Sequence, residues 1–146
     1  MVPHLSLAQD YAARPDDWPF APRWDPSRRW YRRLESHPDR EVWLLTWLPG
    51  QETDLHDHGL SAGAFVVVTG ELVEQTVING RPSTRTYAQG AGREFTRGHI
   101  HRVANSIQRP AVSVHVYGPA LTAMTRYRLV EGRLAVVAVD RAGAQW

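Results

Sequence analysis

Residues 50–58 read GQETDLHDH, and an apolar run from Gly63 to Gly70 follows them. His56 and His58 are two residues apart, so on an extended strand both imidazoles point to the same face. Two imidazoles on one face, about 7 Å apart along the backbone, can converge on one metal ion. A third donor must come from elsewhere in the chain, and residues 98–101 (GHIH) offer two further histidines.

Short segments with a period of two surround this stretch and predict strands. The expected strands are residues 28–34, 41–48, 64–69, 72–78, 83–87, 101–106, 111–117, 124–130 and 134–139. Asn79-Gly80 and Glu131-Gly132 each lie between two extended segments and indicate tight hairpin turns. Many short strands at about ten-residue spacing predict an all-β sandwich or barrel.

The N-terminal segment differs in composition, with five prolines among the first 28 residues. A short helix is expected around Leu5 to Arg14, followed by irregular chain, because proline interrupts regular structure. Trp18 and Trp24 are expected to cover the core from outside. We therefore expect one domain over residues 1–146, with a helical and irregular segment at 1–28 and a barrel at 29–140.

Composition excludes several classes of function. A formal net charge of +2, with arginines scattered along the chain, gives no basic patch for nucleic acid. No apolar run reaches 18 residues and no signal peptide opens the chain, so we expect no membrane association and a cytoplasmic protein. The chain contains no cysteine, so a metal would be held by His, Asp or Glu.

A third group of polar side chains alternates along the expected strand 111–117. Ser113, His115 and Tyr117 all face one side of that strand. On a buried strand such a row requires internal hydrogen bonds, which a Ser-His-Tyr chain would supply. A structural network remote from any metal is the alternative, whereas a Ser-His nucleophile pair lacks an evident acidic partner.

Two motifs resemble those of the cupins. Gly50-x5-His56-x-His58-x4-Gly63-x6-Gly70 is similar to the first cupin motif, in which a glutamate ligand would stand at Gly63. Thr96-x-Gly98-x2-His101-x3-Asn105 is similar to the second, with Thr96 in place of its usual proline. The resemblance implies a double-stranded β-helix, or jelly-roll barrel, with His56, His58 and His101 as three metal ligands. Spacing alone also leaves His99 open, but the cupin register selects His101.

A narrower resemblance covers residues 28–130. His56-Asp57-His58, His101-Arg102-Val103-x-Asn105 and Ser113-x-His115-x-Tyr117 together look like cysteine dioxygenase in its small bacterial form. In the animal enzymes, a cysteine at the Gly63 position is cross-linked to the tyrosine that corresponds to Tyr117. Glycine makes this cross-link impossible, and we expect its missing side chain to leave room for substrate.

The resemblance implies a monomeric, cytoplasmic Fe(II) enzyme that converts L-cysteine and dioxygen to cysteine sulfinate. Ser113, His115 and Tyr117 would be catalytic, and Tyr117 would also contact the substrate. The family uses an arginine on an early strand to bind the substrate carboxylate, for which a guanidinium is suited. Arg32 shares a face with Trp30 and Leu34 and is predicted to point inward, in preference to Arg33. Relatives acting on 3-mercaptopropionate carry glutamine there, so arginine favours L-cysteine.

Other functions remain open at this point. They are a dioxygenase for another small thiol such as 3-mercaptopropionate or for a diketone, a zinc or nickel isomerase with the same barrel, and a non-catalytic cupin that binds a small ligand. Metal analysis and oxygen consumption with small thiols distinguish them.

Overall fold

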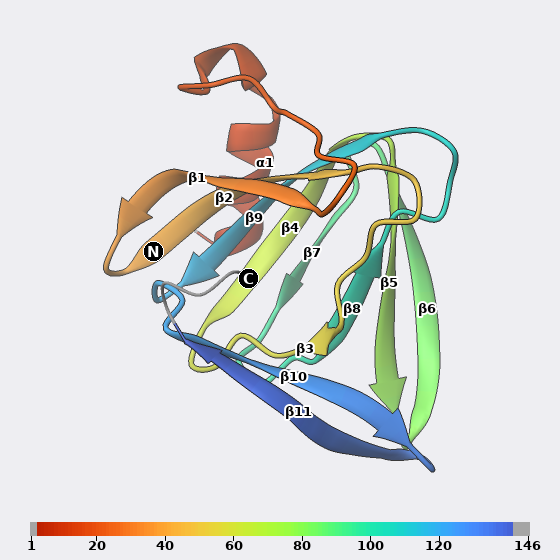
Figure 1. Ribbon diagram of the computed structural model, residues 1–146. Coiled ribbons are helices and arrows are strands. Elements are labelled where there is room, and N and C mark those ends of the chain that lie inside the picture. Colours follow the sequence, from red (N-terminus) through yellow and green to blue (C-terminus); the bar gives the residue numbers. More distant parts are fainter. Residues whose placement is uncertain (1–2, 142–146) are drawn as a thin grey trace.

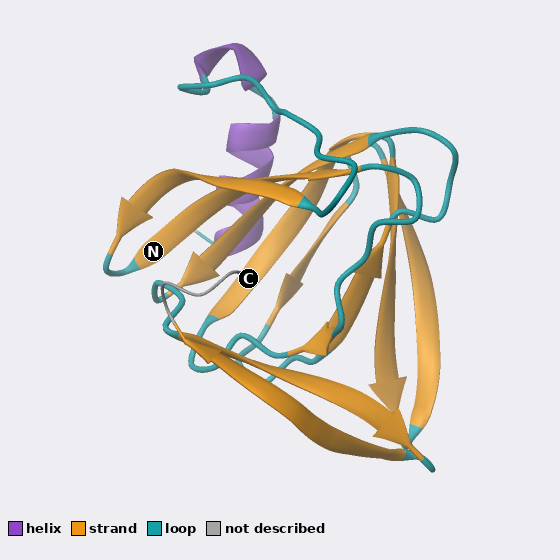
Figure 2. Cartoon of the chain, viewed as in Figure 1, coloured by secondary structure: helices purple, strands orange, loops and turns teal. Residues whose placement is uncertain are grey.

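The computed structural model describes residues 3–141 as eleven strands and a short N-terminal helix (Figures 1 and 2). The helical elements are α1 (His4–Ala12) and the single 3-10 turn η1 (Pro15–Asp17). The strands are β1 (Trp30–His37), β2 (Arg40–Trp47), β3 (Leu55–His56), β4 (Ala62–Thr69), β5 (Glu71–Ile78), β6 (Arg81–Ala88), β7 (Gly92–Phe95), β8 (His101–Ala104), β9 (Ala111–Gly118), β10 (Ala123–Val130) and β11 (Arg133–Arg141).

The strands form two antiparallel sheets that face each other (Figure 1). One sheet has the order β1-β2-β9-β4-β7, and the other has the order β11-β10-β3-β8-β5-β6. Neighbouring strands are often distant in sequence, as where β2 and β4 both pair with β9. This arrangement confirms the predicted all-β jelly roll with a short helical N-terminus.

The five-stranded sheet is buried on both faces. Its inner face contributes Trp47 and Phe65 to the core between the sheets. Its outer face is covered by α1, whose Ala8 packs with Val114 and Val116. Side chains of β9 therefore alternate between two buried layers, which explains why the whole strand from Ala111 to Tyr117 is excluded from solvent.

The predicted hairpin turns are present. Asn79 and Gly80 have φ values of 52° and 75°, and Glu131 and Gly132 have φ values of 49° and 76°. Two successive residues with positive φ are the requirement of the tight turn that matches strand twist. The expected strands lie within a few residues of the observed ones, whereas β3 and β7 were not predicted, because two and four residues carry too little periodicity.

The N-terminal segment covers the outer face of the five-stranded sheet (Figure 2). Helix α1 ends at Ala12, two residues earlier than expected. Trp18 packs in this outer layer as predicted, whereas Trp24 is 41% exposed and does not cover the core. Among residues 3–141, no helix is both long and apolar enough to cross a bilayer.

Candidate metal centre

Three buried histidines meet between the sheets. His56 lies in β3, His58 follows two residues later, and His101 begins β8 directly opposite His56 in the strand register. Their ligand-capable nitrogen atoms all lie within 4.8 Å of one another. Two motifs that are 43 to 45 residues apart in the sequence therefore contribute to one cluster, as the predicted ligand set requires.

The surroundings of the three imidazoles suit them to bind a metal ion. His56 Nδ1 lies 2.8 Å from the Asp54 carbonyl oxygen and His101 Nδ1 lies 2.8 Å from the Glu74 carboxylate, so both rings keep Nε2 for the centre. His58 Nε2 is buried with no hydrogen-bond partner in the described chain, a costly arrangement that a metal ion would relieve. Burial lowers the pKa of all three histidines, which keeps them neutral as metal ligation requires.

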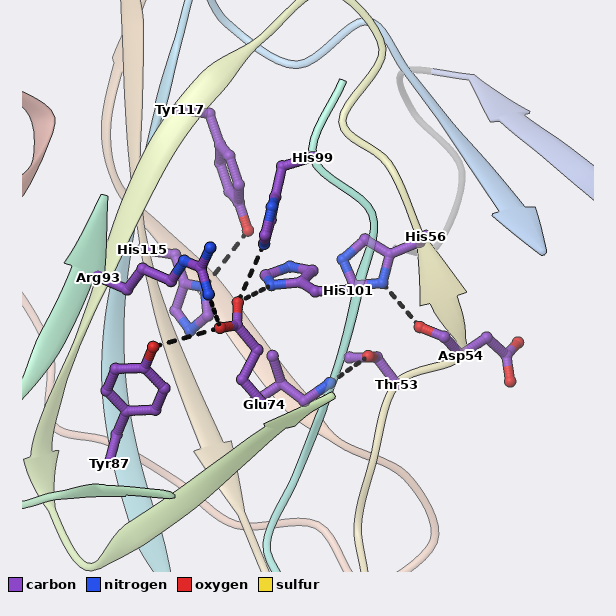
Figure 3. A network of polar contacts seen from close by, with 11 residues as sticks. Thr53, Asp54, His56, Glu74, Tyr87, Arg93, His99, His101, His115 and Tyr117 are labelled. Atoms are coloured by element: carbon purple, nitrogen blue, oxygen red, sulfur yellow. Dashed lines mark hydrogen bonds and ion pairs between the residues drawn. The ribbon is translucent and has the colours of Figure 1, made fainter. Parts of the chain in front are cut away.

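The Glu74 carboxylate organises a second layer beside this cluster (Figure 3). It accepts hydrogen bonds from His101 and from His99, whose Nε2 lies 3.1 Å away. Arg93 donates to the same carboxylate at 2.7 Å. Burial alone would raise the pKa of Glu74, but the bonds from His101 and His99 and the charge of Arg93 lower it well below its usual value. His99 is thus turned toward Glu74 and away from the three-histidine centre.

The predicted polar row on β9 is hydrogen-bonded through its length. Ser113 Oγ lies 2.8 Å from His115 Nε2, and Tyr117 Oη lies 3.4 Å from His115 Nδ1. The Trp47 indole, which sequence reasoning missed, donates to Ser113 Oγ at 2.9 Å. Burial lowers the pKa of His115 to about 3, so this imidazole is neutral and carries one ring proton.

The Trp47 contact gives this chain one self-consistent direction. An indole N–H is a donor only, so Ser113 Oγ accepts from Trp47 and keeps its own hydroxyl proton for a further bond. If that proton goes to His115 Nε2, the single proton of neutral His115 is on Nδ1 and donates to the Tyr117 oxygen. In that arrangement Tyr117 has its hydroxyl proton available for another acceptor. Burial raises the pKa of Tyr117, so the hydroxyl stays protonated.

A cavity of about 560 Å³ reaches this cluster, and His56, His101, His115 and Tyr117 are among its lining residues. Arg29 also lines it, immediately before β1. The guanidinium carbon of Arg29 lies 5.3 Å from the Trp47 ring centroid and 6.0 Å from that of Tyr31. Burial lowers the pKa of Arg29, while its proximity to Tyr117 and Tyr31 opposes that shift. Arg29 therefore lies in the cavity beside the three-histidine cluster, where the sequence predicts Arg32.

The structure does not bring Arg32 to the cluster. Arg32 does share a face with Trp30 and Leu34, but this face packs in the outer layer under the N-terminal segment. Its guanidinium is exposed and stacks 4.2 Å from the Phe20 ring centroid. Arg33 instead donates to buried Glu41 at 2.7 Å. The inner face of β1 belongs to Tyr31, and Arg29 lies two residues before Tyr31 and shares the cavity with it.

Comparison with known proteins agrees with this geometry. The sequence profile of the family described as "Cysteine dioxygenase type I" matches residues 4–129. The chain belongs to the cysteine dioxygenase type I family. Membership and the three-histidine cluster together support a cupin-type, metal-dependent thiol dioxygenase.

Solved structures share the fold of this family member. The TT1209 protein of Thermus thermophilus is 23% identical, with a TM-score of 0.61 over 67% of this chain and 90% of its own. An uncharacterised double-stranded β-helix protein of Klebsiella pneumoniae is 22% identical, with a TM-score of 0.63 over 72% of this chain and 84% of its own. A recombinant oxalate oxidase in complex with glycolate is 16% identical, with a TM-score of 0.59 over 70% of this chain and 57% of its own.

Gly63 is the position at which the resemblance would place the cross-linking cysteine of the animal enzymes. The structure corrects the expectation that glycine leaves room here for substrate. A β-carbon at residue 63 would collide with the Val116 carbonyl oxygen and would lie 2.8 Å from the Phe95 ring. Phe95 in turn stacks on His58, with 4.7 Å between ring centroids. The missing side chain thus makes room for the phenylalanine that supports a proposed metal ligand.

Substituting Gly63 with alanine is therefore expected to destabilise the protein, because the added methyl group overpacks a site bounded by backbone. We expect a loss of about 1–3 kcal/mol in the free energy of unfolding, measured by urea denaturation. Ser83→Ala, on the exposed strand β6, is the control and should change little. Equal stability of Gly63→Ala and the parent protein would contradict the packing described here.

Proposed function

We propose that this chain is a non-haem Fe(II) dioxygenase that converts L-cysteine and dioxygen to cysteine sulfinate. The observation that carries the proposal is one cavity lined by His56 and His101 of the three-histidine cluster, by Tyr117 and by Arg29. The cluster offers the metal site, Tyr117 offers a hydrogen-bond donor and Arg29 offers a cation. An amino-thiol carboxylate presents chemical groups that match all three.

In this proposal His56, His58 and His101 hold the iron, and bound iron supplies the redox chemistry that transfers oxygen to sulfur. Because all three ligands are neutral, the centre keeps a dipositive charge that favours the thiolate form of the substrate. Burial of the three rings between the sheets limits access of water from that side. The chain's part is to orient the sulfur and to hold the rest of the substrate in place.

Arg29 is the proposed carboxylate-binding residue. The cavity has three arginines in its lining, Arg28, Arg29 and Arg126. The Arg28 and Arg126 side chains are 64% and 40% exposed, whereas Arg29 is buried enough for burial to lower its pKa. Arg29 stacks over Trp47 within the cavity, and a partly desolvated guanidinium gains more from a carboxylate than an exposed one.

Tyr117 is the proposed donor to the substrate or to oxygen as it reacts. We assign His115 the tautomer in which Ser113 donates to Nε2 and Nδ1–H donates to Tyr117, which leaves the tyrosine proton free. His115 and Ser113 thereby act through Tyr117, which contacts the reacting groups. This role differs from proton abstraction, because the raised pKa of Tyr117 keeps its oxygen protonated.

Tyr117→Phe should lower kcat by about 10- to 100-fold, because the variant loses one hydrogen bond to a charged group of the substrate or to the charge that develops on oxygen. Iron content should remain that of the parent, since Tyr117 is not a ligand in this account. Steady-state oxygen uptake and metal analysis measure the two quantities. Unchanged turnover would remove Tyr117 from the proposed machinery.

The proposed substrate is tested by loading the protein with Fe(II) without oxygen and then following oxygen consumption. L-Cysteine, 3-mercaptopropionate and cysteamine should be assayed in parallel, and L-cysteine should give the highest kcat/KM. A higher kcat/KM with 3-mercaptopropionate would support the thiol dioxygenase activity but contradict L-cysteine as its substrate. No oxygen uptake with any of the three thiols would favour a non-catalytic cupin.

We also propose that the protein works in the cytoplasm as a monomer. Size-exclusion chromatography tests the oligomeric state.

A further inference from the structure

Glu74 is a buried carboxylate that the proposed reaction does not use. It lies in the middle of β5 and is 1% exposed. A buried charge is costly unless it is hydrogen-bonded and paired, and Glu74 has four such contacts (Figure 3). The four contacting side chains come from three different strands and the loop before β8. Such a complete set of partners indicates a defined task for this carboxylate.

The two carboxylate oxygens have separate partners. Oε1 accepts from Arg93 at 2.7 Å and from Tyr87 at 3.3 Å. Oε2 accepts from His101 at 2.8 Å and from His99 at 3.1 Å. Arg93 and Tyr87 thus fix the rotation of the carboxylate so that Oε2 faces the two histidines.

Glu74, His99 and His101 are also close enough to form a metal-binding group of their own. The Arg93 guanidinium on Oε1 argues against that use, because a second cation there would be repelled at close range. His101 Nδ1 is already engaged with Glu74, and its remaining nitrogen belongs to the three-histidine centre. The group is therefore a hydrogen-bonded support for His101.

Among the three proposed ligands, His101 has a distinct electrostatic environment. The Nδ1–H of His56 faces a neutral backbone carbonyl, whereas that of His101 faces a carboxylate. A carboxylate draws the imidazole proton more strongly, which makes the opposite nitrogen a stronger electron donor to a metal. The same bond fixes the tautomer, because His101 must carry its proton on Nδ1 to satisfy Glu74.

We propose that Glu74 is the positioning residue that fixes His101 and sets the electron-donating strength of the metal centre, and that Arg93 moderates its effect. The inference rests on the three-histidine metal site proposed above and not on the identity of the thiol. A cupin carboxylate ligand would stand at Gly63, and here a carboxylate acts on the metal through a histidine instead. Because Arg93 balances part of its charge, Glu74 strengthens donation by His101 without adding a full negative charge to the centre.

Two charge-changing variants test this proposal. In Glu74→Gln, the amide cannot offer acceptors to the histidines and to Arg93 at once, so His101 loses its support. Arg93→Gln keeps a donor near Oε1 but leaves the carboxylate charge unbalanced. We expect Glu74→Gln to weaken Fe(II) binding by about 10- to 100-fold and to raise the Fe(III)/Fe(II) reduction potential. Arg93→Gln should lower that potential.

Both quantities are measured without any thiol, by anaerobic metal titration and by redox titration. Shifts of the reduction potential in opposite directions in the two variants support the proposal, because loosened packing alone would not raise the potential in one variant and lower it in the other. Shifts in the same direction, or no shift, would overturn it. Tyr87→Phe is the matched control, since it removes a neutral donor from the same oxygen and should change the potential least of the three.

Glu74→Asp covers the case in which the glutamine variant does not fold. It keeps the charge but withdraws the carboxylate from His101 by one methylene, so weaker Fe(II) binding and a higher potential are again expected. A folded Glu74→Asp protein with parental affinity and potential would overturn the proposal. Failure of the thiol dioxygenase function would appear separately, as absent oxygen uptake in a parent protein that binds iron normally.

Discussion

Replacing His58 with alanine is expected to abolish stoichiometric iron binding and, with it, all oxygen uptake with L-cysteine. The cluster has no protein carboxylate at Gly63, so the variant keeps two neutral imidazoles, fewer than metal sites of this kind use. His58 is chosen because its Nε2 is buried without a hydrogen-bond partner in the described chain, which leaves metal binding as its evident role. Metal content after anaerobic loading and desalting measures the effect.

His99→Gln is the matched control for this experiment. His99 stacks on Phe95 and contacts Glu74, but it lies outside the three-histidine group. The variant should therefore keep one iron per chain. Iron retained in His58→Ala, or lost in His99→Gln with His101 intact, would contradict the ligand set proposed here.

Arg29→Ala is expected to raise KM for L-cysteine by about 10- to 100-fold, the cost of losing charge-assisted hydrogen bonds to a carboxylate. Cysteamine has a thiol and an amine but no carboxylate, so its kcat/KM should change little. The comparison of these two substrates within one variant isolates the carboxylate contact from general damage to the cavity. Steady-state oxygen uptake supplies both constants.

Arg32→Ala and Arg33→Ala complete the arginine series. Arg32 stacks on Phe20 in the outer layer, so its removal should leave KM for both substrates unchanged. Arg33 pairs with Glu41, and its loss should lower stability more than it alters the substrate ratio. A cysteine-specific rise in KM for Arg32→Ala, with Arg29→Ala unaffected, would restore the sequence-based choice and refute the one made from the structure.

The prediction of Arg32 as the carboxylate-binding residue shows what periodicity cannot tell: which face of a strand lines the barrel interior. The alternation along β1 was correct, since Trp30, Arg32 and Leu34 do share a face. The error was to equate the apolar face with the interior of the barrel, because α1 and the segment after it create a second buried layer outside the sheet. Arg29 lies within the expected strand 28–34 on the same face as Arg33, the face predicted to point outward, and in the structure it stands immediately before β1 begins.

Local spacing predicted the parts of the site that lie within one strand or one motif. His56 and His58 share a site and the row from Ser113 to Tyr117 is hydrogen-bonded as their spacing implied, whereas the choice of His101 over His99 came from the resemblance to the cupin motifs. Two other contacts join distant strands and could not be read from local spacing. Glu74 in β5 contacts His101, 27 positions later, and Phe95 in β7 fills the space beside Gly63 in β4. A charged residue at an inward position between Leu72 and Thr76 was the available signal for Glu74, but only the sheet register identifies its partner.

The reaction proposed for this chain transfers both oxygen atoms of dioxygen to the sulfur of L-cysteine. The direct measurement is a single-turnover reaction of the Fe(II)-loaded protein with L-cysteine under ¹⁸O₂, followed by mass spectrometry of the product. The expected product is cysteine sulfinate that carries two ¹⁸O atoms. Cystine as the sole product, or a sulfinate with oxygen drawn from water, would contradict it.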